Sequence, residues 1–161
     1  MNIYFELLSK DNYEESLDVL NKIFPDDVEI ARRHYDEFLD KNNPAWRDER
    51  FWQYYVVKGD DKKIIALTGL YNSYKHEPGD IWLGWYGVLP DYRGKGVGRE
   101  VLKLTMEKAR EMGYKKFKLW TTTDTGEENA QRLYDDMNIK IYNKIMHEGG
   151  EYEILYREVN L

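Results

Sequence analysis

Three glycines at alternating positions lie among basic residues in the middle of the chain, after an apolar run. Glycine permits backbone conformations and close approaches that a side chain forbids. A helix that starts at such a segment offers free N–H groups and the positive end of its dipole to an anion. The spacing therefore predicts that a phosphate or pyrophosphate group binds here. The residues concerned are Arg93, Gly94, Lys95, Gly96, Val97, Gly98 and Arg99.

Two other phosphate-binding patterns fit this segment poorly. A P-loop needs the spacing G-x-x-x-x-G-K-[ST], which does not occur in the sequence. A dinucleotide fingerprint needs glycine where Arg99 stands. It also needs an acidic residue about 20 positions further on, where threonines 121–123 stand instead. A nucleotide-binding α/β protein is therefore the weaker interpretation.

A third pattern, [RQ]-x-x-G-x-[GA], is matched by Arg93, Gly96 and Gly98. The residues directly before it, GVLPDY, contain the sequence V-x-P-x-Y. Here the chain resembles the GNAT superfamily of acetyl-coenzyme A-dependent N-acyltransferases. Residues 128–139, ENAQRLYDDMNI, are similar to a second family segment, N-x-x-A-x-x-[LF]-Y-x-x-x-G-F. The match runs through Ala130, Leu133 and Tyr134. It departs where Glu127 holds the asparagine position, with Asn129 nearby, and where Asn138 and Ile139 replace Gly-Phe.

The resemblance implies acetyl-CoA as a cosubstrate. Its pyrophosphate would lie on the glycine segment, and its pantetheine arm would add to the strand of residues 81–89, which splays from the next strand. Gly84 and Gly87 inside that strand fit a bulge or a close approach. The resemblance implies cofactor contacts from the main chain of Tyr86, Gly87 and Val88 and from Asn129.

The resemblance also implies the reaction. A primary amine would attack the thioester directly, through a tetrahedral intermediate whose oxyanion accepts the Val88 N–H. Tyr134 would then protonate the departing thiolate as a general acid. Tyr134 is also one of 14 tyrosines, many of which must be packing residues. Trp82 and Gly84 stand where family members often place a carboxylate, so no general base is assigned.

The elements that must position these residues follow from periodicity and from Gly, Pro and Asn punctuation. They predict a single domain over residues 1–161 of mixed α/β (α+β) class, with a mostly antiparallel mixed sheet flanked by helices. In the helix after the glycines, Val101, Leu102, Thr105, Ala109 and Met112 form the expected core face. The expected strands are 3–8, 51–59, 63–72, 81–89, 115–123, 139–146 and 151–159, and the expected helices are 9–24, 26–41, 98–112 and 127–137.

Composition limits the remaining functions. The chain has no cysteine, its three histidines lack metal-ligand spacing, and no apolar run is long enough to span a membrane. The net charge of −6 argues against nucleic acid as a partner. Ten acidic and four basic residues between 11 and 41 suggest a cationic acceptor, although solvated helix faces explain the same count.

Two functions remain open after these exclusions. The first is a cytoplasmic N-acetyltransferase that acts on a small-molecule or peptide amine, with no membrane partner. The second is a non-catalytic acyl-CoA-binding sensor or interaction module. Intact Arg93, Gly96, Gly98 and Tyr134 favour the enzyme. Assembly as a homodimer stays open.

Overall fold

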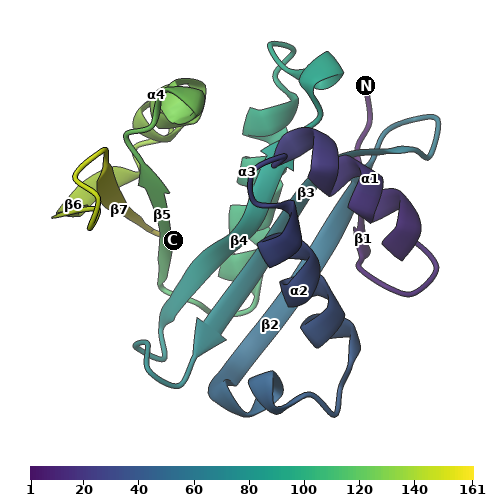
Figure 1. Ribbon diagram of the computed structural model, residues 1–161, viewed down its shortest axis with the longest axis horizontal. Coiled ribbons are helices and arrows are strands. Elements are labelled where there is room, and N and C mark those ends of the chain that lie inside the picture. Colours follow the sequence, from purple (N-terminus) through teal and green to yellow (C-terminus); the bar gives the residue numbers. More distant parts are fainter.

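The computed structural model describes residues 1–161, apart from the side chain of Thr125. Its helices and strands follow the predicted order (Figure 1). The strands are β1 (Tyr4–Leu7), β2 (Glu49–Lys58), β3 (Ile64–Ser73), β4 (Asp80–Val88), β5 (Lys116–Thr122), β6 (Lys140–Met146) and β7 (Glu153–Asn160). The α-helices are α1 (Tyr13–Ile23), α2 (Val28–Leu39), α3 (Val97–Glu111) and α4 (Glu128–Asp136), and short 3₁₀ turns cover Pro44–Asp48, Pro90–Tyr92 and Thr125–Glu127.

The strands form one seven-stranded sheet in the order β1-β2-β3-β4-β5-β7-β6. Every neighbouring pair is antiparallel except β4 and β5, which run parallel. A parallel pair needs a crossover connection, and α3 supplies it. The mixed, mostly antiparallel sheet that the sequence predicts is confirmed.

The parallel pair opens soon after it starts. Only Asp80, Ile81 and Trp82 pair with β5, through residues 116–118, although β4 continues to Val88. Figure 1 shows the two strands diverging above this short contact. The expected splay is therefore present, and it leaves the main chain of the second half of β4 without a β5 partner.

A bulge lies in the half of β4 that has no β5 partner. Leu67 of β3 pairs with Gly87 and Gly69 pairs with Gly84, so β4 has one extra residue between these two pairs. Gly87 also permits a close approach, because a Cβ there would lie 2.4 Å from Cγ2 of Ile23 in α1. Both roles that the sequence suggested for interior glycines thus occur in this strand.

The helices cover the two faces of the sheet unequally. In Figure 1, α1 and α2 lie over one face of the β1–β4 half and α3 lies over the other, with α4 near the end of β5. On the face that α1 and α2 cover, no helix lies over β5, β6 and β7. The two largest buried clusters are Leu20, Tyr35, Phe38, Tyr54 and Leu67 with their neighbours under α1 and α2, and Leu70, Ile81, Leu102, Phe117 and Leu119 with theirs under α3 and α4.

Most of the predicted core face of α3 is buried. Val101, Leu102, Thr105 and Ala109 are each 0% exposed. The prediction for Met112 was wrong, because it is the C-cap of the helix and is 40% exposed. No helix in the described part of the chain is both long and apolar enough to cross a membrane.

Candidate active site

The glycine segment forms a turn that leads directly into α3. Gly94 and Gly96 have φ values of 73° and 82°, in the left-handed region that favours glycine. Gly96 is the N-cap of α3, and Val97, its first residue, is buried. A Cβ added at Gly94 or Gly96 would meet nothing within 4 Å, so the turn faces open space. The free N–H groups of the helix start can therefore meet an anion.

The basic residues around this turn have different environments. The Arg93 guanidinium donates through Nε to the carbonyl of Val88 at 2.9 Å, which ties the turn to the end of β4. Lys95 Nζ donates to the Asp91 carbonyl at 3.0 Å. Arg99 forms an exposed ion pair with Asp136 of α4, at 3.1 Å. All three side chains are exposed, so their charge is available to a ligand at the helix start.

Tyr86 joins β4 to the same helix start through its side chain. Its hydroxyl donates to the carbonyl of Gly98 at 2.7 Å. A Cβ at Gly98 would lie 3.0 Å from this hydroxyl and 3.8 Å from Cδ2 of Leu133. The third glycine of the segment therefore lets α3 approach both β4 and α4. Sequence analysis assigned Tyr86 only main-chain contacts and missed this bond.

Tyr134 is brought to the same place from α4. It is 6% exposed and packs with Leu102 and Leu119 in the core under α3. Its phenol lies close enough to Tyr86 to help raise the pKa of that hydroxyl, although burial contributes more. Burial and the negative charge of Glu127 raise the pKa of Tyr134, while Arg157 opposes the rise. The phenol is therefore protonated throughout the neutral range.

The main chain at the end of β4 is oriented by its pairing with β3. Leu89 N–H donates to the carbonyl of Ile65 on β3 at 2.9 Å. Because successive residues of a strand direct their N–H groups to opposite sides, the N–H of Val88 is directed away from β3, toward the opening beside β5. The Val88 carbonyl, which accepts from Arg93, is on the same side.

α4 is held by a buried arginine that the sequence analysis did not single out. Arg157 of β7 is 2% exposed. It donates to Gln131 Oε1 at 2.9 and 3.1 Å, to Asp135 Oδ1 at 2.8 Å and to the Ile139 carbonyl at 2.7 Å. Its guanidinium lies 5.7 Å from the ring centre of Tyr134. An arginine on an alternating strand is the only signal that could have indicated this role.

Glu127 and Asn129, the two candidates at the asparagine position of the family segment, have different surroundings. Glu127 accepts from the Thr122 N–H at 2.8 Å and from the Thr122 hydroxyl, which links α4 to the end of β5. Asn129 is exposed on α4, and none of the described contacts connects it with the glycine turn. The other site residues named from the sequence converge at the start of α3.

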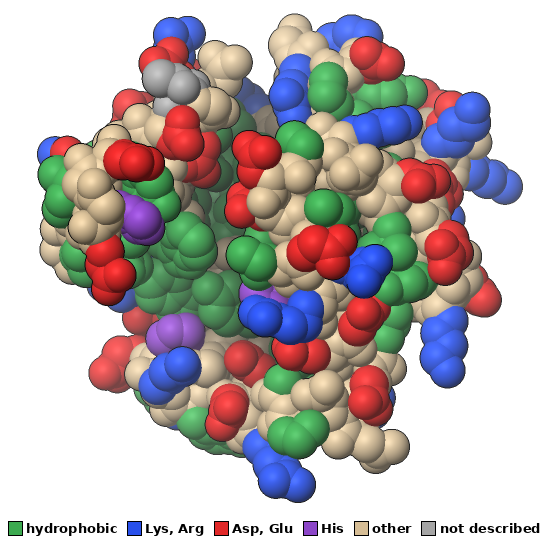
Figure 2. All heavy atoms as spheres, in the orientation of Figure 1, with side chains coloured by type: hydrophobic (Ala, Val, Ile, Leu, Met, Phe, Trp, Pro, Cys, Tyr) green, Lys and Arg blue, Asp and Glu red, His purple; other side chains and the backbone are tan. Residues whose placement is uncertain are grey.

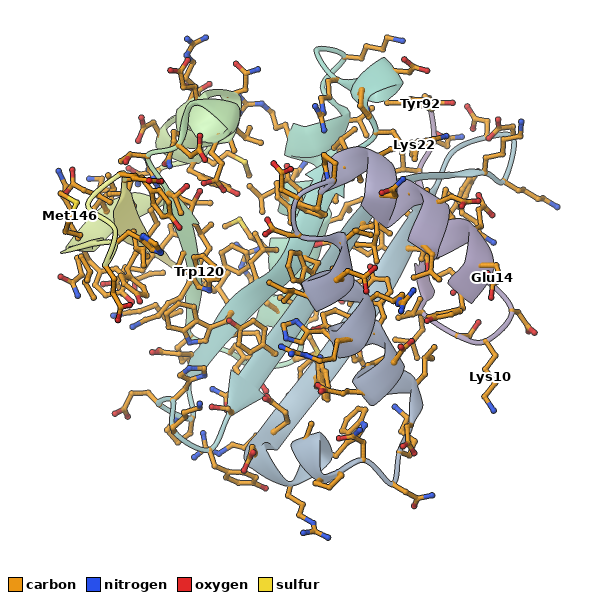
Figure 3. All side chains as sticks on the ribbon, viewed as in Figure 1. Lys10, Glu14, Lys22, Tyr92, Trp120 and Met146 are labelled. Atoms are coloured by element: carbon orange, nitrogen blue, oxygen red, sulfur yellow. The ribbon has the colours of Figure 1, made fainter. Side chains whose placement is uncertain are left out.

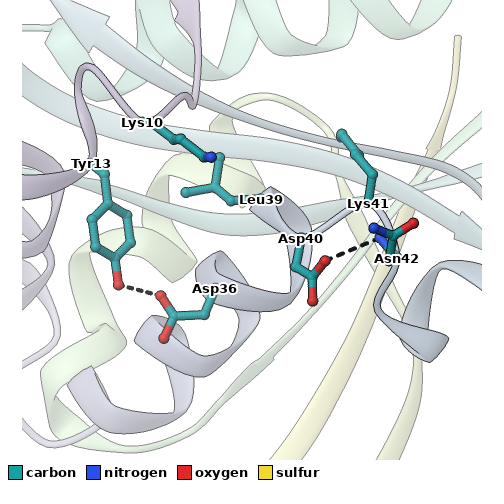
Figure 4. Close-up of a pocket in the computed structure, with 7 residues that line it drawn as sticks. All are labelled: Lys10, Tyr13, Asp36, Leu39, Asp40, Lys41 and Asn42. Carbon is teal, nitrogen blue, oxygen red and sulfur yellow. Dashed lines mark hydrogen bonds between the residues drawn. The ribbon is translucent and has the colours of Figure 1, made fainter.

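A cavity of 630 Å³ lies elsewhere, between α1 and α2 (Figure 4). It is lined by Lys10, Tyr13, Asp36, Leu39, Asp40, Lys41 and Asn42. The Tyr13 hydroxyl is bonded to Asp36 across it. None of its residues belongs to β4, α3 or α4, so it is separate from the site described above. Within the described residues, no group of three or more histidines and carboxylates could hold a metal ion.

Comparison with known proteins identifies the family to which this chain belongs. A model of the Acetyltransferase (GNAT) family matches residues 14–138, which include the opened β4, the glycine turn, α3 and α4. The chain belongs to the GNAT acetyltransferase family. As a GNAT protein it is an N-acetyltransferase, and the acetyl donor of this family is acetyl-CoA. A search of curated proteins gave no significant match.

Solved structures share the fold of this GNAT protein at low sequence identity. A GNAT-family protein from Desulfovibrio desulfuricans is 15% identical, with a TM-score of 0.82 and 99% of both chains covered. A GNAT acetyltransferase from Elizabethkingia anophelis with acetyl-CoA bound is 18% identical, with a TM-score of 0.69 and 99% of both chains covered. The spermidine/spermine N-acetyltransferase of Vibrio cholerae is 14% identical, with a TM-score of 0.71, over 99% of this chain and 95% of that one.

Proposed function

We propose that this protein acetylates a primary amine by direct attack on acetyl-CoA, with the start of α3 and the opened edge of β4 as the donor site. The observation that carries the proposal is the convergence of Tyr86, Gly98 and Tyr134. The Tyr86 hydroxyl donates to Gly98 at the helix start, and the Tyr134 phenol lies close enough to affect its pKa. A helix start suited to phosphate, the strand edge and a candidate proton donor would thus meet around one opening.

The residues of the glycine turn fit a pyrophosphate. Gly94 and Gly96 leave open space before the N–H groups of the helix start, and Lys95 and Arg99 add exposed positive charge beside it. Arg93 would contribute by holding the turn against Val88, since its Nε is already bonded there. Acetyl-CoA supplies an activated acetyl group when it is bound, and the protein contributes position and charge.

The end of β4 fits the remainder of the donor. Without a β5 partner beyond Trp82, the main chain of Tyr86, Gly87 and Val88 can bond an extended amide-containing arm as a further strand would. The Val88 N–H, directed toward the opening, would donate to the thioester oxygen. Negative charge develops on that oxygen as the amine adds, so this bond would be strongest in the tetrahedral intermediate.

Tyr134 would supply the proton that the leaving thiolate takes up. The bond that forms joins the amine nitrogen to the acetyl carbon, and the bond that breaks is the carbon–sulfur bond of the thioester. The amine loses a proton to water, the thiolate gains one from the phenol, and the phenolate regains a proton from water. A pKa above the ordinary value keeps the Tyr134 phenol protonated until the thiolate forms.

The proposed acetyl transfer is tested by measuring free thiol release from acetyl-CoA in the presence of amines, amino acids and short peptides. Mass spectrometry of the products would show which amine is acetylated. Amine-dependent thiol release is expected. Binding of acetyl-CoA without turnover on any amine would favour the alternative, a non-catalytic sensor. The Vibrio cholerae relative is named for polyamines, but 14% identity shows the fold alone and does not choose an acceptor here.

A further inference from the structure

The uncovered face of the sheet forms a groove beside the proposed donor site. Figure 2 shows a hollow lined by hydrophobic side chains, between the α1–α2 half of the molecule and the β5–β7 half. Cross-strand pairing places Trp82, Trp120 and Tyr156 on this face, because Trp82 pairs with Lys118 and Trp120 pairs with Tyr156. Trp120 is 56% exposed and lies on this side of β5 in Figure 3. We call Trp82, Trp85, Trp120, Tyr142 and Tyr156 the aromatic groove.

Three members of the aromatic groove contact one another, and a fourth, Trp85, contacts α2. The rings of Trp82 and Tyr156 meet edge to face at 6.3 Å, and those of Tyr142 and Tyr156 lie 6.2 Å apart. On the opposite wall, the indole of Trp85 donates to His34 Nδ1 at 3.0 Å. Burial lowers the pKa of His34, which keeps it neutral and able to accept this bond.

A carboxylate with an unsatisfied oxygen lies at the far end of the groove. Glu49 is the first residue of β2 and pairs with Ser73, two residues along β3 from Tyr71, the partner of Trp82. Its negative charge helps to raise the pKa of Tyr71, so the two side chains lie near each other. Glu49 Oε2 is buried and has no hydrogen-bond partner among the described residues. Leaving a buried carboxylate oxygen without a donor is costly.

The surroundings of Glu49 disfavour its ionised form. Asp48 repels a negative charge there, Lys75 attracts it, and Glu37 and Glu49 both raise the pKa of Tyr54 from nearby. Burial and Asp48 prevail over Lys75, so the pKa of Glu49 is raised to about 7. Lys118 brings a positive charge into the groove, but it is paired with Asp80 at 3.1 Å. A cationic ligand group would therefore supply the missing hydrogen-bond donor and stabilise the ionised form of Glu49.

The length of the groove separates Glu49 from the place where the acetyl group would lie. Gly87 of β4 pairs with Leu67, and Glu49 pairs with Ser73, six residues further along β3. Six residues of strand span about 20 Å, and the reach of the glutamate side chain shortens the separation to about 15 Å. One amine cannot occupy both ends. Glu49 is also too far away to remove a proton from the attacking amine.

We propose that Glu49 binds a second cationic group of the acceptor, at the opposite end of the aromatic groove from the amine that is acetylated. The acceptor is thus an extended molecule with two ammonium groups about 15 Å apart. Aromatic faces attract cations and pack against the chain between them. The net negative charge of residues 11–41, which include α1 and α2, adds a favourable long-range field. This inference rests on the proposed acetyl transfer and names its substrate class.

The test compares α,ω-diamines of increasing length with monoamines of the same length, on the wild type and on Glu49→Gln. A methylene chain extends by about 1.2 Å per bond, as extended backbone does, so diamines of about 10 to 12 carbons span the groove. Such diamines should have the highest kcat/KM on the wild type. Glu49→Gln should lower that kcat/KM roughly 10- to 100-fold, as expected for a lost bond to a charged group. Monoamine turnover should stay within about twofold.

Two further arms complete the experiment. Peptides of five residues with lysine or norleucine at the last position show whether the second cation belongs to a peptide instead, and a lysine preference that Glu49→Gln abolishes supports the same site. Glu6→Gln, on the distant β1, is the control for loss of a carboxylate and should leave kcat/KM for both diamines and monoamines unchanged. Equal effects of Glu49→Gln on diamines and monoamines, or no effect on either, would overturn the proposal. Calorimetric binding of a diamine to both proteins gives the same comparison without turnover, so failure of catalysis and failure of this site are distinguished.

Discussion

The Tyr86 hydroxyl donates to the carbonyl of Gly98 at 2.7 Å, and this bond joins the opened half of β4 to the first turn of α3. A Cβ on residue 98 would lie 3.0 Å from the hydroxyl oxygen. The two residues are therefore fitted to each other, and the fit fixes the distance between the strand edge and the helix start that the donor site needs.

Substituting these two residues together should reveal their coupling. Gly98→Ala should lower stability and raise the KM for acetyl-CoA, because the new methyl displaces the Tyr86 ring. Tyr86→Phe alone should cost about 1 kcal/mol for the lost hydrogen bond. In the double variant the oxygen that meets the methyl is absent, so the combined cost should be smaller than the sum by roughly 0.5 kcal/mol or more. Urea unfolding of all four proteins measures the coupling, and strict additivity would count against the fit.

Tyr134→Phe should reduce kcat by roughly 10²- to 10⁴-fold, because it removes the proton donor and keeps the ring. The melting temperature and the affinity for acetyl-CoA should change little. Tyr35→Phe is a matched control, since Tyr35 is also a buried tyrosine and its hydroxyl has no partner among the described residues. That control should keep full activity. Normal turnover in a well-folded Tyr134→Phe protein would assign the proton to water or to another group.

Arg157→Met should destabilise the protein by about 2–3 kcal/mol, because several bonds from a buried charged group are lost. Activity should fall as well, since α4 carries Tyr134. Asp135→Asn removes only the partner that is 68% exposed in the pair, and should cost less than about 1 kcal/mol. Unfolding curves for both variants test this order. A larger cost for Asp135→Asn than for Arg157→Met would contradict the assigned role of the arginine.

The folded protein should bind a proton at Glu49 more tightly than the unfolded chain does. Its pKa is raised from 4.5 to about 7 by burial, so stability from this group is complete below pH 4.5 and is lost as the pH rises through 7. Glu49→Gln does not titrate and escapes this loss. The difference in melting temperature between Glu49→Gln and wild type should therefore increase from pH 5 to pH 8. A difference that stays constant with pH would show that Glu49 titrates normally.

The sequence predicted the local features of this fold well, because each depends on nearby residues. The left-handed backbone at Gly94 and Gly96 and the element order follow from glycine and periodicity. The contacts made across the chain could not be predicted in this way. The bond from Tyr86 to Gly98 and the close approach of Ile23 to Gly87 depend on which elements become neighbours in the sheet and its covering helices.

The residues of the candidate site also fall into those with a local sequence pattern and those that only the fold reveals. The glycine turn and Tyr134 were found from short motifs, whereas Arg157 and Glu49 have no local pattern that separates them from surface charges. Arg157 is recognised only by its burial against α4, and Glu49 only by an oxygen that nothing in the described chain satisfies. The aromatic groove likewise exists because β5 and β7 place tryptophan and tyrosine beside each other on an uncovered face.

The most direct measurement of the central claim is calorimetric titration of acetyl-CoA into the wild type, Gly96→Asp and Gly113→Asp. Gly96 and Gly113 stand at opposite ends of α3, both with positive φ and open space around an added Cβ, so the two substitutions impose similar backbone strain. Only Gly96→Asp places a negative charge where a pyrophosphate would lie. Acetyl-CoA should bind to the wild type and to Gly113→Asp with similar affinity, and at least about tenfold more weakly to Gly96→Asp. Equal affinity of all three proteins would contradict the assignment of the donor site to the start of α3.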